Sequence, residues 1–251
     1  MISQNKIKLV NSLNKKKYRD INQLFIAEGE KLVMDLIQGQ VQVFELFVRE
    51  GWTGITQLPP EINCTETTEQ YLKKITQLKT PPPIIAICKI PQTEINSYTW
   101  KDKLTIALDD IQDPGNLGTI IRLADWFGIE NIVCSQNTAD AYNPKVVQAT
   151  MGAVARVQVY YTNLEEFLEK QLKNHIPVYG TFLDGENIYQ QNLSENGIIV
   201  MGNEGKGISS AIESLVSKKL LIPSFSKNKD QSESLNVSTA TGIILSEFRR
   251  R

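Results

Sequence analysis

The stretch DPGNLGTIIR, residues 113–122, follows the apolar run LTIAL and combines an amide with a guanidinium near the start of a predicted helix. Its Pro-Gly pair favours a tight turn, and Asn116 is a natural N-terminal cap. Arg122 could bind a ligand, but it could equally extend to solvent or pair with Asp125. The glycines lack the spacing of a dinucleotide fingerprint or a Walker loop, which disfavours both kinds of nucleotide-phosphate binding.

Two later stretches carry similar polar groups. VMGNEGKGIS, residues 200–209, sets Glu204 among glycines that allow close backbone approach, with nothing apolar for it to pack against. IPSFSKNKDQSESLN, residues 222–236, ends in Ser234 and Asn236 before a predicted helix. Ser234 alone could be a plain helix cap, but that explanation accounts for neither the asparagine nor the long polar loop. Both stretches therefore predict ligand-binding loops.

Strands that must position these loops precede each of them. Beyond residue 103, runs that are apolar nearly throughout alternate with amphipathic helices, which indicates a parallel sheet covered on both faces. In open parallel sheets, ligands bind outside the carboxyl ends of the strands. We therefore expect the three loops to form one site.

A smaller α/β unit of strands and helices precedes this sheet. The irregular stretch KIPQTEINSYTWKDK predicts the boundary, giving domains at 1–95 and 96–251. The first twenty residues combine helically spaced apolar residues with a local basic excess, so they predict a helix that docks one face. The basic side chains of this segment include Lys15, Lys16, Lys17 and Arg19, and they could offer a binding surface or simply be solvated.

Composition excludes several other classes of protein. The chain of 251 residues has a formal net charge of −1 and 41 % hydrophobic residues, which is ordinary globular composition. No apolar segment reaches membrane-spanning length, so we expect no membrane association and a cytoplasmic location. The three cysteines, with no metal-site spacing, predict no metal centre. A single histidine, His175, weakens histidine-based hydrolytic mechanisms.

Taken in order, these loops resemble the three sequence motifs of the SpoU (TrmH-type) RNA ribose 2′-O-methyltransferases of the SPOUT class. The matching residues are those of NLGTIIR, GNEGKG and IP…SLNVSTATGIIL, together with NPKVVQATMGAVARV between the first two motifs. The N-terminal KIKLVNSLNKKKYRD…FIAEGEKLV is similar to the small ribosomal-protein-like substrate-binding domain of that family. One departure is the third motif, where the loop at 223–233 is longer than usual and carries SKNKDQ.

The resemblance implies a C-terminal parallel-sheet α/β domain with a deep trefoil knot, a homodimer, and S-adenosylmethionine as cofactor. It implies methyl transfer to a ribose 2′-hydroxyl of RNA, with ribosomal RNA favoured by the N-terminal domain. The RNA-binding residues expected from it are Lys15, Lys16, Lys17 and Arg19. The implied catalytic residues are Arg122, Asn116, Glu204, Ser234 and Asn236. The implied cofactor contacts are Gly202, Ile222, Leu235, Thr181 and Leu183. Because a guanidinium is effectively always protonated, Arg122 fits a phosphate and oxyanion clamp more easily than a base.

Three alternatives stay open from the sequence. The enzyme could act on transfer RNA, since such enzymes share the catalytic half. The chain could also be a catalytically silent RNA-binding module of the same fold. A nicotinamide oxidoreductase is disfavoured because the dinucleotide fingerprint is missing.

Overall fold

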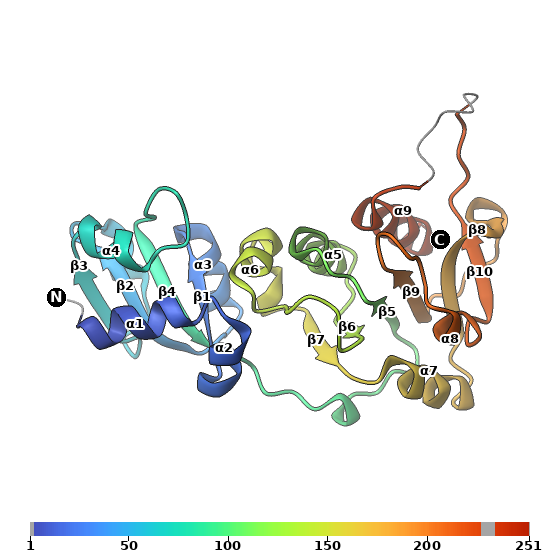
Figure 1. Cartoon of the computed structure of the whole chain (residues 1–251), viewed down its shortest axis with the longest axis horizontal. Coiled ribbons are helices and arrows are strands. Elements are labelled where there is room, and N and C mark those ends of the chain that lie inside the picture. Colours follow the sequence, from blue (N-terminus) through green and yellow to red (C-terminus); the bar gives the residue numbers. More distant parts are fainter. Residues whose placement is uncertain (1–2, 227–233, 251) are drawn as a thin grey trace. The chain divides into compact units, whose positions relative to one another are not determined.

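The computed structural model describes residues 3–226 and 234–250. Its chain divides into two compact units, one of residues 1–92 and 140–156, the other of residues 93–139 and 157–251 (Figure 1). The domains predicted from the sequence are consecutive, whereas these units are not. Residues 140–156 pack with the first unit because Val147 and Val154 belong to its hydrophobic core. None of the described helices is both long and apolar enough to cross a membrane.

The first unit is built on a four-stranded sheet of order β1-β4-β2-β3. Its strands are β1 (Leu24–Glu28), β2 (Val43–Arg49), β3 (Cys64–Thr67) and β4 (Ile84–Lys89). β4 pairs antiparallel with β1 and β2, and β2 pairs parallel with β3.

Helices cover both faces of this sheet. Along β4, Ile84 and Ala86 enter one hydrophobic cluster while Ile85 and Ile87 enter the other, as the two-residue period of a strand requires. The first cluster packs against α3 (Glu30–Gln38) and α6 (Pro144–Thr150), and the second against α1 (Gln4–Ser12) and α4 (Glu69–Ile75). Burial raises the pKa of Glu28, whose carboxylate accepts hydrogen bonds from Thr76 Oγ1 and, at 2.9 Å, from Gln77 N.

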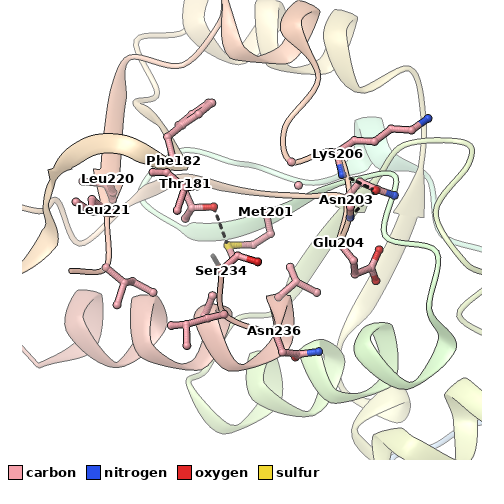
Figure 2. A pocket seen from close by; sticks show the side chains of 18 residues that line it. Thr181, Phe182, Met201, Asn203, Glu204, Lys206, Leu220, Leu221, Ser234 and Asn236 are labelled. Carbon is pink, nitrogen blue, oxygen red and sulfur yellow. Dashed lines mark hydrogen bonds between the residues drawn. The ribbon is translucent and has the colours of Figure 1, made fainter. Parts of the chain in front are cut away.

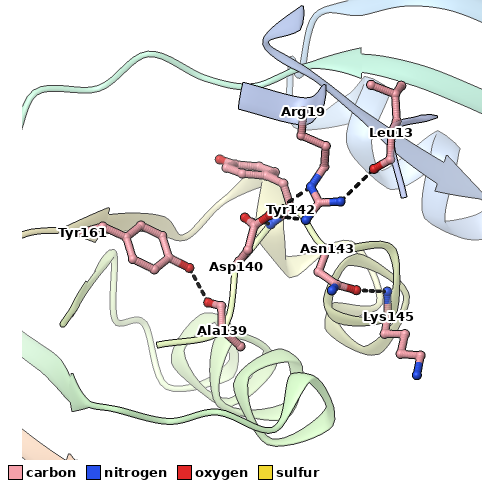
Figure 3. A network of polar contacts seen from close by, with 8 residues as sticks. All are labelled: Leu13, Arg19, Ala139, Asp140, Tyr142, Asn143, Lys145 and Tyr161. Carbon is pink, nitrogen blue, oxygen red and sulfur yellow. Dashed lines mark hydrogen bonds and ion pairs between the residues drawn. The ribbon is translucent and has the colours of Figure 1, made fainter. Parts of the chain in front are cut away.

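Helix α2 (Lys16–Asn22) turns Arg19 into the first unit rather than toward solvent. Arg19 is 1 % exposed, and its Nε donates to Asp140 Oδ2 at 2.8 Å while Nη1 donates to the Leu13 carbonyl at 2.7 Å (Figure 3). Nη2 also pairs with Asp140. The Arg19 guanidinium is therefore buried and already bonded, rather than exposed as a contact with RNA would require.

The second unit contains a fully parallel six-stranded sheet of order β10-β8-β9-β5-β6-β7. Its strands are β5 (Leu104–Asp109), β6 (Asn131–Cys134), β7 (Gln158–Tyr161), β8 (Val178–Asn187), β9 (Gly197–Gly202) and β10 (Lys218–Leu221). From β5 the chain proceeds outward to β6 and β7, then returns to the other side through β8 and β9. The order thus reverses at β5 and β9, where open parallel sheets bind their ligands.

Helices cover both faces of this sheet as well. α7 (Leu164–Lys173) and α8 (Ser210–Glu213) pack on one face, in the cluster that contains Ala107, Val133 and Val200. α5 (Pro114–Trp126) and α9 (Val237–Arg249) pack against each other, α5 also against β6 and α9 against β9 (Figure 1). The predicted parallel α/β sheet covered on both faces is confirmed.

Candidate active site

A pocket of about 520 Å³ lies at the carboxyl ends of β9 and β10 and beside the middle of β8 in the second unit. Four chain segments line it: 181–183 within β8, 201–207 from the end of β9 onward, 220–222 at the end of β10, and 234–237 with Ala240 at the start of α9. Figure 2 shows Glu204 and Asn236 toward one end and Leu220 and Leu221 toward the other. The volume lies in the range of small-molecule and cofactor sites.

Gly202 determines how the β9 loop meets this pocket. A Cβ at this position would lie 2.3 Å from the carbonyl carbon of Gly207, because the turn folds back directly over it. Two backbone hydrogen bonds of 2.9 Å between Asn203 and Gly207 close the turn, and Gly207 adopts a φ of 71°. Only glycine therefore fits at 202, and the turn presents its backbone to the pocket.

All five residues predicted as cofactor contacts line the pocket. They are Thr181, Leu183, Gly202, Ile222 and Leu235. Their contact with a cofactor stays a prediction. Residues 227–233, the centre of the extended third-motif loop, lie outside the described part of the chain.

The pocket walls suit a nucleoside joined to an uncharged or zwitterionic group. Leucine, isoleucine, valine and alanine side chains form apolar walls for a planar base, and loop backbone offers amide donors and carbonyl acceptors. Lys206 is the only basic residue among the lining residues that the structure describes, so a pyrophosphate would find few partners. Thr181 Oγ1 and Met201 Sδ lie 3.9 Å apart within the pocket. This donor set fits S-adenosylmethionine better than a dinucleotide.

Asn116, Glu204 and Asn236 form one hydrogen-bonded cluster at the end of the pocket. Asn116 Nδ2 donates to Glu204 Oε1 at 2.9 Å, and Asn236 Nδ2 donates to Asn116 Oδ1 at 3.0 Å. Glu204 also accepts the backbone N–H groups of Gln112 and Asp113, at 3.4 and 3.3 Å. Loops that are far apart in sequence thus meet through side chains, as the strand-end argument predicted.

Two helix starts differ from the sequence-based expectation. Asp113, not Asn116, caps α5, and its side chain accepts from Asn116 N at 2.9 Å, so the Asn116 side chain is free to bond Glu204 and Asn236. Asn236, not Ser234, caps α9, accepting from Ser238 N and Thr239 N. Ser234 lines the pocket but forms no hydrogen bond with the described residues, so the structure does not join it to the cluster.

Arg122 lies on α5 with its side chain exposed. It forms no hydrogen bond or ion pair within residues 3–226 and 234–250, so the pairing with Asp125 considered from the sequence is not formed. The guanidinium is outside the set of pocket-lining residues and available for an external anion.

Three of the four basic side chains expected to bind RNA are exposed, and the fourth, Arg19, is buried. Lys15, Lys16 and Lys17 are exposed, and Lys16 already has a partner within the chain. Tyr18 and Ile21, which the sequence patterns did not single out, are 38 % and 65 % exposed on the same helix.

Among the described residues, no group of three or more His, Cys, Asp or Glu side chains could hold a metal ion.

Comparisons with known proteins agree with this fold. The SpoU rRNA Methylase family matches residues 103–246, and the MRM3-like substrate binding domain matches residues 4–86. A TrmH-family protein from Porphyromonas gingivalis is 39 % identical, with a TM-score of 0.90 over 100 % of this chain and 99 % of that one. The AdoMet-bound rRNA methyltransferase from Sinorhizobium meliloti is 29 % identical, with a TM-score of 0.88 over 100 % and 97 % of the two chains.

A curated relative extends over nearly the same length. The 23S rRNA (guanosine(2553)-2′-O)-methyltransferase RlmP of Bacillus subtilis is 31 % identical over 245 residues, covering 97 % of this chain and 96 % of the relative. Fold and pocket together define an α/β methyltransferase of the SPOUT class. The chain belongs to the SpoU rRNA methylase family.

Proposed function

We propose that the protein methylates a ribose 2′-hydroxyl of ribosomal RNA, with S-adenosylmethionine as the methyl donor. The observation that carries the proposal is the Asn116–Glu204–Asn236 cluster at the end of a nucleoside-sized pocket, in a chain of the SpoU family. Ribosomal RNA is favoured over transfer RNA because the Bacillus subtilis relative, alike over nearly its whole length, is named as a 23S rRNA enzyme.

Within this proposal the pocket holds the cofactor through Gly202, Ile222, Leu235, Thr181 and Leu183. Bound S-adenosylmethionine supplies an activated methyl group on sulfur. What the chain must add is alignment of the ribose hydroxyl, whose proton passes to solvent, and stabilisation of the negative charge that develops on its oxygen.

Arg122 and the polar cluster divide that task. The free guanidinium of Arg122 grips the neighbouring phosphate and donates toward the 2′-oxygen. Asn116 and Asn236 orient the ribose, Glu204 fixes Asn116 by accepting its amide hydrogen, and Ser234 contributes a hydroxyl from the opposite loop. No residue of the cluster requires a metal ion.

The first unit serves as the RNA-binding part, with residues 15–17 contacting phosphates. Its match to a substrate-binding domain family supports this role. We further propose that residues 1–95 and 96–251 are the substrate-binding and catalytic parts of the chain in function, that the second unit is knotted as in its class, and that the protein works in the cytoplasm.

A homodimer is also part of the proposal. Trp126, at the end of α5, is 84 % exposed, which is unusual for so large an apolar side chain and supports a protein contact there. Light scattering at micromolar concentration is expected to give twice the chain mass of 28.3 kDa. A mass of one chain would refute this part.

Two measurements test the function itself. Calorimetry should show that S-adenosylmethionine binds and NADH does not; absence of cofactor binding would leave a silent RNA-binding module. Mapping of 2′-O-methyl groups in total RNA from cells with and without the gene should show one or more ribosomal positions lost. Loss at a transfer RNA position instead would reassign the substrate.

A further inference from the structure

Three adjacent strands of the second unit end in polar residues that bond one another. β9 leads into Asn203, β5 into Asp110 and β6 into Ser135, and these strands are neighbours in the sheet order. None of the three was among the predicted site residues. Asp110 lies between the other two, because β5 lies between β9 and β6 in the sheet.

Asp110 has an uncommon backbone conformation, with a φ of 58°. Non-glycine residues avoid this left-handed region, although Asp and Asn tolerate it better than others. Ser135 holds Asp110 on both sides: its hydroxyl accepts from Asp110 N at 2.9 Å and donates to Asp110 Oδ1 at 2.5 Å. Asn137 Nδ2 adds a weaker donor to Asp110 Oδ2 at 3.4 Å.

This conformation aims the Asp110 carbonyl at the loop that carries Glu204. Asn203 Nδ2 donates to the Asp110 carbonyl at 2.7 Å, and Asn203 Oδ1 accepts from Gly205 N and Lys206 N at 3.0 Å each. The Asn203 side chain therefore ties the turn around Glu204 to the β5 loop. The same β5 loop supplies the Gln112 and Asp113 N–H groups that Glu204 accepts.

We infer that Ser135 and Asp110 are positioning residues for the Asn116–Glu204 pair, acting through Asn203. They fix the relative placement of the β5 and β9 loops before any substrate arrives. The expected change in kcat rests on the proposed methyl transfer. The hydrogen bonds that join the β5 and β9 loops do not, because they are present in the free protein.

Ser135→Ala removes the two hydrogen bonds to Asp110 with little change in side-chain size. We expect kcat to fall between about 10- and 100-fold, since small misplacements of a reacting constellation cost that much. The dissociation constant of S-adenosylmethionine should stay within about twofold, because the substitution removes positioning and not a cofactor contact. Ser135→Thr, which keeps the hydroxyl, should restore most of kcat.

Asp110 offers a second series. Asp110→Asn keeps both an acceptor oxygen and tolerance of a positive φ, so it should retain most of kcat. Asp110→Ala loses both and should lower kcat at least as much as Ser135→Ala. All kcat measurements are made at a temperature where melting curves show each variant fully folded.

Ser194→Ala is the matched control. The Ser194 hydroxyl also bonds a nearby residue, accepting from Asn196 N at 3.2 Å and donating to the Asn196 carbonyl at 2.8 Å, but it lies before the start of β9. This control should leave kcat unchanged. Wild-type kcat in Ser135→Ala, or a reduction that Ser135→Thr does not restore, would overturn the inference.

Hydrogen exchange followed by mass spectrometry separates this inference from the proposed function. Amides of the 203–207 turn should exchange faster in Ser135→Ala than in wild type or in Ser194→Ala. Unchanged exchange overturns the inference whether or not the enzyme is active. If wild type neither binds S-adenosylmethionine nor methylates RNA while the turn still loosens, the proposed function fails and the tie stands.

Discussion

Replacing Asp140 by alanine should destabilise the first unit far more than the loss of an ordinary ion pair. Asp140 accepts from two nitrogens of the Arg19 guanidinium, and the side chains of Arg19 and Asp140 are only 2 % and 15 % exposed. Its Oδ1 also accepts from Tyr142 N at 2.9 Å. The substitution leaves a buried positive charge with only the Leu13 carbonyl as partner.

The expected cost follows from that burial. Removing one partner of a buried, hydrogen-bonded ion pair typically costs about 3–5 kcal/mol of unfolding free energy. With a urea dependence of about 2 kcal/mol per molar, the unfolding midpoint should fall by about 2 M. Urea-dependent hydrogen exchange of peptides from α2 and β1 reports this unit separately from the other.

Two further variants sharpen the test. Arg49→Ala breaks the Arg49–Glu69 pair of 3.9 Å, which lies in the same unit and whose side chains are 49 % and 64 % exposed, and should cost less than about 1 kcal/mol. Arg19→Met combined with Asp140→Leu removes both charges together and should recover most of the stability. If Asp140→Ala shifts the midpoint no more than Arg49→Ala, the reasoning from burial is refuted.

The remaining predictions concern catalysis, RNA binding, pH and thiol reactivity. Arg122→Ala should abolish methyl transfer while calorimetry shows nearly unchanged cofactor affinity; lost cofactor binding or wild-type turnover would contradict the clamp role. Neutralising residues 15–17 should make RNA binding less dependent on salt. The slope of log binding constant against log salt concentration should become less steep by about one for each phosphate that the variant no longer binds, whereas an unchanged slope would show that these side chains are merely solvated. Burial raises the pKa of Glu28 above the 4.5 of the unfolded chain, so wild type loses stability relative to Glu28→Gln as pH rises from 4 to 7; urea midpoints that do not diverge would exclude this. Burial raises the pKa of Cys88 to about 12, so native alkylation at pH 8 should modify the partly exposed Cys64 first, and mass spectrometry showing Cys88 labelled first would argue against that packing.

The catalytic half was predictable because its signals are local and repeated. Apolar runs of strand length identify buried parallel strands, and residues that follow such strands meet at one edge of the sheet. That rule alone brings Asn116, Glu204 and Asn236 together. The proline at the first position of α5, Pro114, is a signal that the motif-based prediction missed. Proline favours the first position of a helix, so the cap is the residue before it, Asp113, and not Asn116.

Sequence reasoning failed where a contact between residues far apart in the chain determines the position of a side chain. A run of lysines followed by Arg19 looks the same in sequence whether the arginine faces water or the interior. The group that buries it, Asp140, lies 121 residues away. Asp110 and Ser135 were missed for a related reason, because a positive φ and a bond between strand ends exist only once the sheet has formed.

The placement of residues 140–156 in the first unit has a consequence for synthesis of the protein. The first unit cannot be completed when residue 92 leaves the ribosome, because its last segment, residues 140–156, is finished only 64 residues later (156 − 92). At 5–20 residues per second, this delay is roughly 3 to 13 s. During that interval the apolar face that α6 will cover is open, and strand β5 has emerged before its neighbour β9 exists. The nascent chain therefore holds two unfinished hydrophobic surfaces at once, which makes this stage the natural point for chaperone binding.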